Sequence, residues 1–116
     1  GTTAKSLEDT LLKRLDQVDD LIAANSSNEK SINKLFDNMK CTFQKIGLVK
    51  YDAFQEMGGK LSFSLAMLNE EDDGFVINAV HSREGCYLYI KDIEKGETET
   101  LLGSEEKEAL ERALGY

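Results

Sequence analysis

Apolar residues in the amino-terminal part of the chain recur at alternating steps of three and four positions. This spacing is the heptad pattern of a helix that presents one apolar seam. The seam consists of Leu11, Leu15, Val18, Ile22, Ile32, Phe36, Met39, Phe43 and Ile46. Asn25 and Glu29 fill the two middle positions of the seam, and the run 25–28 has low helix propensity. We therefore expect one long helix with coiled-coil character over 1–46, weakened or hinged at 25–28 and ended by Gly47.

The two halves of the seam call for different partners. We expect the half from Ile32 to Ile46 to pack on the sheet of its own domain. The half formed by Leu11, Leu15, Val18 and Ile22 has no obvious partner within the chain. An exposed apolar seam of this kind favours self-association, so we expect a homodimer in which these four residues face a second helix.

After Gly47 the period of the apolar pattern changes to two, which is typical of strands. Alternating runs cover 61–67, 75–81 and 86–91, and glycine-bearing turns bound them. Residues 48–54 and a short segment, Glu99 to Leu102, are further candidate strands. Ser104 is a candidate cap for a final helix whose buried stripe is Ala109, Leu110, Ala113 and Leu114. The fold class is α+β: a long helix, then a domain over 47–116 with an antiparallel meander of four or five strands and a short carboxy-terminal helix.

Strand parity divides the residues of this sheet between two faces. We expect one face to contribute to the core, with His81 at its edge and Cys86 buried; its apolar members include Phe75, Ile77, Ala79, Leu88 and Ile90. The second face is shallower and more polar, with Ser62, Ser64, Asn78, Tyr87 and Tyr89. Such a mixture suits a peptide or a small ligand. Small residues also let a helix lie close, and we favour this second interpretation.

The segment HSREG, residues 81–85, holds the chain's one histidine, and Cys86 follows it. A four-residue loop would place His81 and Cys86 opposite each other, at a spacing that a nucleophilic Cys–His pair could use. No residue nearby in sequence would orient the imidazole or form an oxyanion site. We therefore interpret the segment as a turn between strands and assign no catalytic residue.

The sequence contains little evidence of a metal or cofactor site. One histidine and two cysteines, spaced by 40 and 5 residues, match no zinc pattern. The acidic run 69–74 resembles the start of a calcium loop, but the twelfth position is Val80 instead of a bidentate glutamate. We expect no metal, no cofactor and no enzymatic activity.

Charge and composition narrow the classes of partner. The formal net charge of −8 disfavours binding to nucleic acid or to anionic lipid headgroups. Two isolated cysteines suit a reducing compartment better than a disulfide framework. No apolar stretch reaches the ~18 residues of a membrane span.

Three stretches, 47–54, 58–68 and 81–91, are the most specific parts of a likeness that covers nearly the whole chain. In these residues the sequence resembles an uncharacterised bacterial family, domain of unknown function 4446. The resemblance implies an amino-terminal transmembrane helix and a basic stretch ahead of the coiled coil, and thus a position at the cytoplasmic face of the bacterial membrane. The 116 residues contain neither feature, so we expect any contact with the membrane to depend on an anchor outside them.

Two functions fit these observations. The first is a non-enzymatic interaction or scaffold module near the membrane, dimerised through its helix and holding the small domain for a protein partner. The alternative is a domain that senses a small ligand or peptide with the face that carries Ser62, Ser64, Asn78, Tyr87 and Tyr89.

Overall fold

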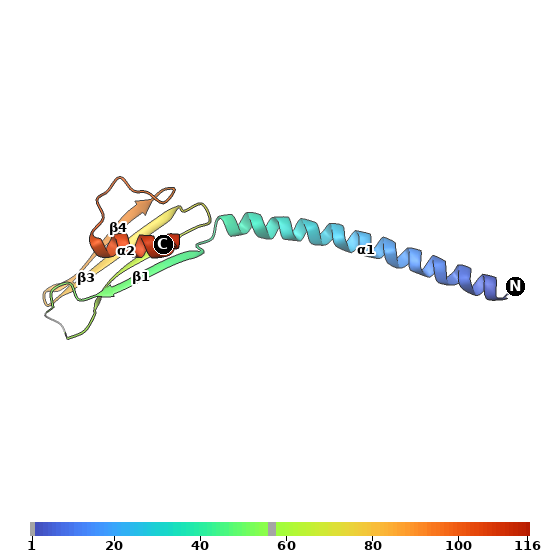
Figure 1. Cartoon of the computed structure of the whole chain (residues 1–116), viewed down its shortest axis with the longest axis horizontal. Helices are drawn as coiled ribbons and strands as arrows, with labels where there is room; N and C mark the ends of the chain where they lie inside the picture. The colour runs from blue at the N-terminus through green and yellow to red at the C-terminus, as the bar shows by residue number, and fades with distance from the viewer. Residues whose placement is uncertain (1, 56–57) are drawn as a thin grey trace. The chain divides into compact units, whose positions relative to one another are not determined.

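The computed structural model describes residues 2–55 and 58–116 of the chain. Its elements are α1 (Thr2–Lys40), β1 (Lys45–Tyr51), β2 (Ser62–Leu68), β3 (Gly74–Ser82), β4 (Gly85–Ile93) and α2 (Ser104–Leu114). They are coloured along the chain in Figure 1. The chain forms two compact units, Gly1–Asp37 and Asn38–Tyr116. The predicted α+β class is therefore confirmed, with four strands.

α1 is a single uninterrupted helix of 39 residues. It passes through 25–28 without a break, and there the Asn25 amide donates a hydrogen bond to Glu29 at 3.2 Å. This bond joins two side chains one turn apart, so the polar residues of the seam support the helix locally. The prediction of one helix instead of two is confirmed.

The predicted end of this helix was wrong. α1 ends at Lys40, and Gly47 lies inside β1. The error arose because Phe43 and Ile46 continue the spacing of the seam although neither residue is helical. In β1, Ile46 and Gly47 point to opposite faces of the sheet, as consecutive residues of a strand do.

The four strands form an antiparallel meander in the order β1-β2-β3-β4. A fifth strand, predicted at Glu99 to Leu102, is absent from the described chain, where 98–103 forms an irregular connection to α2. The acidic segment 69–73 is the turn between β2 and β3. In this turn the Asn69 side chain accepts hydrogen bonds from the backbone N–H groups of Glu71 at 2.9 Å and Asp73 at 3.1 Å.

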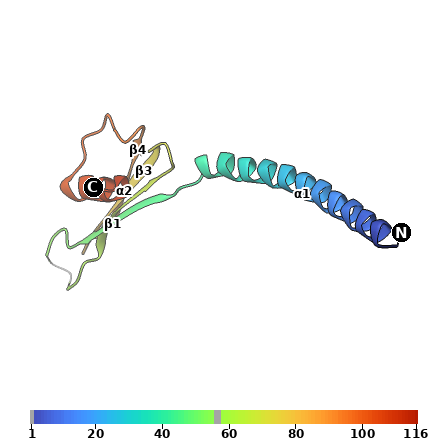
Figure 2. The same ribbon diagram turned by 45° about the vertical axis from the view of Figure 1, so that its right-hand side comes forward.

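α2 lies against one face of the sheet, over β1, β2 and β3 (Figures 1 and 2). The helix begins one residue after its cap, which is Gly103 and not the predicted Ser104. The Glu106 carboxylate accepts a hydrogen bond from the Gly103 N–H at 2.9 Å, which closes the first turn. The predicted stripe of α2 is confirmed, since Ala109, Leu110 and Ala113 are buried and Leu114 packs against the core.

The core between α2 and the sheet is small and tightly packed. Its buried apolar residues are Val49, Ala66, Leu68, Val76, Ile93, Ala109, Leu110 and Ala113. Gly47 allows the close approach: a Cβ built there would lie 2.0 Å from the Ala109 carbonyl oxygen. Lys91 on β4 donates to the buried Glu106 carboxylate at 2.8 Å, which ties α2 to the edge strand farthest from β1.

At the outer edge of the sheet, α2 also contacts the backbone of β1. The Arg112 guanidinium donates a hydrogen bond to the Leu48 carbonyl at 2.7 Å. Arg112 also pairs with Glu108 one turn earlier on α2, at 3.1 Å. Arg112, the α2 side chain that reaches this edge, is therefore itself held in place by Glu108.

Replacing Gly47 with alanine tests the close approach of α2. The new methyl group would overlap the backbone of α2, so α2 must move away from the sheet, and we expect a loss of about 1–3 kcal/mol in the free energy of unfolding. Urea denaturation measures this loss. Gly58→Ala is the matched control, because a Cβ at Gly58 would meet nothing within 4 Å, and its effect should stay within about 0.5 kcal/mol. Equal stability of the two variants would contradict this close packing of α2 on β1.

Candidate interaction surfaces

The face of the sheet predicted to bind a ligand is the face that α2 covers. Ser62 and Ser64 are 2% and 0% exposed. The Ser62 hydroxyl accepts a hydrogen bond from the His81 N–H at 2.9 Å. The small size of these residues allows α2 to pack closely, which is the interpretation that the sequence favoured.

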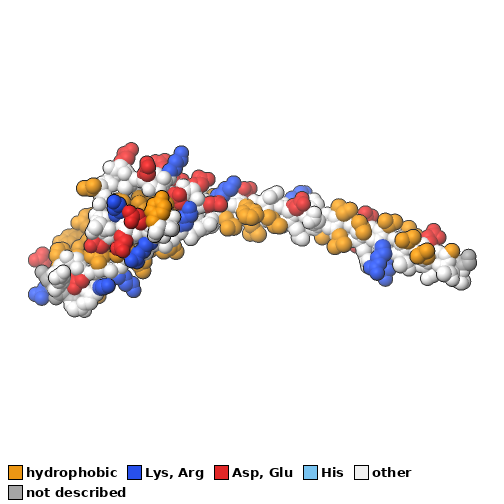
Figure 3. Space-filling model, in the orientation of Figure 1, with side chains coloured by type: hydrophobic (Ala, Val, Ile, Leu, Met, Phe, Trp, Pro, Cys, Tyr) orange, Lys and Arg blue, Asp and Glu red, His pale blue; other side chains and the backbone are white. Residues whose placement is uncertain are grey.

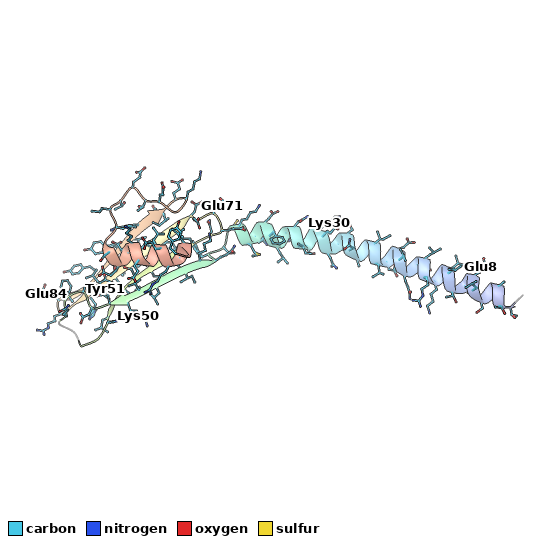
Figure 4. All side chains as sticks on the ribbon, viewed as in Figure 1. Glu8, Lys30, Lys50, Tyr51, Glu71 and Glu84 are labelled. Carbon is cyan, nitrogen blue, oxygen red and sulfur yellow. The ribbon has the colours of Figure 1, made fainter. Side chains whose placement is uncertain are left out.

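The polar side chains on this face bond mainly to one another. Asn78 accepts hydrogen bonds from the Ser64 hydroxyl at 2.9 Å and from the Tyr51 hydroxyl at 2.6 Å. Tyr51 lies at the end of β1 (Figure 4). Asn78 therefore joins three strands under α2. Its carbonyl oxygen serves the structure of the domain, which leaves less polar capacity for a ligand.

Tyr87 and Tyr89 complete the predicted ligand face, and they differ from its other members. They lie on β4, which is outside the strands that α2 covers most, and they remain 54% and 51% exposed. The structure thus divides the predicted site into a buried polar part on β2 and β3 and an exposed aromatic part on β4.

The opposite face of the sheet is apolar and open, which reverses the expectation for the core. Ile46, Leu48, Leu88 and Ile90 are between 40% and 66% exposed, and Cys86 is exposed as well. Phe63, Leu65, Met67, Phe75 and Ile77 on the same face are half-buried. We name the apolar residues of this side of the four strands the open face.

Parity placed the residues on shared faces correctly but did not show which face α2 covers. The sequence contained one usable signal. Gly47, Ser62, Ser64 and Ala66 leave room for a helix backbone, whereas the opposite face carries large side chains. The core therefore forms on the face that lets α2 pack closely, although the open face has the larger apolar area.

His81 and Cys86 face each other across the β3–β4 hairpin, in the register that a short turn produces. The turn itself is Arg83 and Glu84, and Glu84 is labelled in Figure 4. The Ser82 hydroxyl donates to the Gly85 carbonyl at 3.1 Å and accepts from the Glu84 N–H at 3.3 Å. The segment HSREG thus forms a turn, as interpreted. The expectation of a buried Cys86 was wrong, because this side chain lies on the face of the sheet that α2 does not cover.

The predicted dimer seam on α1 is exposed along its whole length. Leu11 is 57% exposed, Leu15 59%, Val18 48% and Ile22 63%. No described residue of α1 is buried within its own compact unit, and the packing of Ile32 and its neighbours on the sheet stays a prediction. Hydrophobic side chains are visible on the surface along this helix in Figure 3.

Comparison with known protein families places these surfaces in context. A family model described as "Protein of unknown function (DUF4446)" matches residues 1–114. The chain belongs to the DUF4446 family. No curated protein and no solved structure matches this DUF4446 chain closely enough to count as a relative. The match covers the residues of α1 as well as those of the sheet and α2.

Two properties of the described residues bear on the chemistry of this DUF4446 protein. Within 2–55 and 58–116 no group of three or more His, Cys, Asp or Glu side chains is placed to hold a metal ion. Across the same residues, no helix is both long and apolar enough to cross a membrane.

Tyr51 predicts a pH dependence of stability. Burial raises the pKa of its phenol, and the negative charges of Glu105 and Glu106 raise it further, against the lowering effect of the hydrogen bonds to Asn78 and Ser64. A group whose pKa is raised by folding stabilises the fold below its ordinary value of 10.0, and this stabilisation is lost as the pH rises through the higher folded pKa. The stability of the parent protein should therefore fall as the pH rises through the folded pKa of Tyr51.

The comparison that isolates this contribution is Tyr51→Phe against Tyr116→Phe, since Tyr116 is 89% exposed. Urea unfolding at several pH values should show the parent more stable than Tyr51→Phe near neutral pH, with the difference shrinking in alkali. Tyr116→Phe should follow the parent throughout. A constant difference between the parent and Tyr51→Phe across the alkaline range would refute the assignment.

Proposed function

We propose that this protein is a non-enzymatic interaction module that self-associates through α1 and presents the small α+β domain to a protein partner. The observation that carries the proposal is the exposed seam of Leu11, Leu15, Val18 and Ile22 on an uninterrupted helix. Burying one such side chain in a facing helix contributes about 1.5–3 kcal/mol before the costs of ordering.

The spacing of the seam supports a paired helix over an isolated one. The steps of three and four residues keep the four side chains on one line as the helices supercoil. A solitary helix would gain nothing from this alignment, because its apolar residues would remain in water. Charges flank the seam, including Asp16, Asp19 and Lys13, and they keep the remaining sides of the helix solvated.

The dimer is expected to be weak in dilute solution. The uninterrupted apolar part of the seam is short, and Asn25 and Glu29 occupy its next two positions. These features favour a dissociation constant in the micromolar range. A membrane anchor outside the chain, of the kind implied by the family resemblance, would hold the module at the cytoplasmic face and raise the local concentration of the helices. In this arrangement weak association is sufficient, and it stays reversible.

Charges placed in the seam test the proposal. In Leu15→Glu with Ile22→Glu, two carboxylates would have to be buried between the helices. We expect the dissociation constant, measured by sedimentation equilibrium, to rise at least about tenfold. Circular dichroism should show that the sheet domain remains folded.

The matched control is Gln17→Glu with Ala24→Glu. These changes have the same seven-residue separation and give two exposed carboxylates on the side of α1 away from the seam. The control should associate as the parent does. If the seam variant and its control have the same dissociation constant, α1 does not mediate self-association.

A further inference from the structure

The open face is a continuous apolar surface that crosses the whole sheet. In the central row the Cα partners run Leu48, Leu65, Ile77 and Ile90, one residue from each strand. The row on one side contains Ile46, Met67 and Phe75, and Phe43 packs edge-on against Phe75 with the ring centroids 5.3 Å apart. The row on the other side contains Phe63, Ala79 and Leu88. Apolar side chains are thus adjacent in both directions.

The area of the open face is that of an interface and exceeds that of an incidental patch. Ile46, Leu88 and Ile90 are 60%, 66% and 66% exposed, and Leu48 and Phe43 are 40% and 49% exposed. With roughly 150–200 Å² for each large side chain, these five leave about 500 Å² of apolar surface in water. The total comes to on the order of 700 Å² with the half-buried residues of the face, Phe63, Leu65, Met67, Phe75 and Ile77. The largest patch on a typical monomer is about 300–600 Å², whereas a standard protein interface takes about 800 Å² from each partner.

The charges around the open face select a partner that is equally uncharged. The chain has a formal net charge of −8, yet the three central rows of this face contain charged residues only at their ends, Lys50 on β1 and Asp92 on β4. Burying an unpaired charge against such a surface would cost several kcal/mol. A strongly charged protein surface, a nucleic acid or a lipid headgroup therefore fits poorly, whereas a second open face fits.

The width of the open face indicates a sheet as the occupant and argues against a single helix. On the opposite side, α2 with its eleven residues covers β1 to β3 and leaves Tyr87 and Tyr89 on β4 about half exposed. A single helix on the open face would likewise leave one edge strand in water. Leu88 and Ile90 on β4 are as apolar as the central strands, so the cover must extend over all four strands.

We infer that the open face packs against the open face of a second copy of this chain, so that the two sheets form the layers of a β-sandwich. Two sheets pack in this way about 10 Å apart, with the inner side chains interdigitated. Each copy supplies the four-strand width and the uncharged surface that the other requires, and the areas match. This contact uses a different surface from the α1 seam and does not depend on the proposed role of α1.

The first test uses the full chain that carries Leu15→Glu and Ile22→Glu, so that association through α1 is already weakened. Ile46→Glu and Leu88→Glu are then added as the face variant. Both residues are at least 60% exposed in the single chain, so the fold should tolerate them. We expect the chain without these changes to associate still, and the face variant to raise its dissociation constant at least about tenfold.

The matched control adds Leu101→Glu and Tyr116→Glu to the same background. These residues are 90% and 89% exposed and lie outside the sheet, so the control introduces two carboxylates without touching the open face. It should associate like its parent. Equal association of the face variant and this control overturns the inference, whereas the comparison between seam variant and seam control decides the role of α1 separately. Circular dichroism verifies that each variant is folded.

Cys86 provides an independent measurement, because it is exposed in the single chain and lies on the open face beside Leu88. Its alkylation, followed by peptide mapping, should slow as the protein concentration rises from ~1 to ~100 μM, the range in which a micromolar dimer forms. In the face variant the rate should not depend on concentration. If the alkylation rate of Cys86 in the unmodified chain does not change with protein concentration, this face stays in water and the inference is overturned.

Discussion

The close contact between α2 and the sheet is the constraint on which the domain depends. At Gly47 the backbone of α2 approaches so closely that a Cβ would lie 2.0 Å from the Ala109 carbonyl oxygen. Only small residues fit beneath a helix at this distance, and Ser62, Ser64 and Ala66 on β2 meet that requirement. Side chains alternate along a strand, and on β2 the small residues alternate with Phe63, Leu65 and Met67, which therefore lie on the other face. The same contact that builds the core therefore leaves the open face in water.

This arrangement also accounts for the polar groups in and beside the small core, of which Ser62, Ser64 and Glu106 are buried. Ser64, Asn78 and Tyr51 form one hydrogen-bonded group, and Glu106 joins Lys91 to the cap of α2. Each of these groups gains a partner on folding, which offsets the cost of removing it from water, although among the described residues the Glu106 Oε2 atom is buried without a hydrogen bond. The bonds also fix the position of α2 along the sheet, since Glu106 and Lys91 come from different layers. Packing supplies the contact, and the polar bonds determine its register.

The sequence predicted the elements and favoured a helix over the face with small residues, but it also predicted that the opposite face contributes to the core. The change of period after the long helix, the turns and the stripe of Ala109 and Leu110 were all readable because they depend on local spacing. Which face is covered depends on a contact between residues far apart in sequence, such as Gly47 and Ala109, and no periodicity encodes that pairing. Hydrophobicity wrongly predicted that the opposite face contributes to the core, because it ranks Leu65 and Phe75 above Ser62 and Ser64. The end of α1 was misplaced for a related reason: Phe43 and Ile46 satisfied two patterns at once.

The bond from Arg112 to the Leu48 carbonyl gives the two edges of the sheet unequal chemical character. On the β1 edge this acceptor is already engaged, and Lys45 and Lys50 lie near the two ends of the strand. A strand from another molecule could add there only by displacing the guanidinium and desolvating the lysines. Intermolecular strand addition, the first step of many aggregation processes, is thus disfavoured on this side. The α2 helix therefore shields the edge strand of the sheet as well as covering its core.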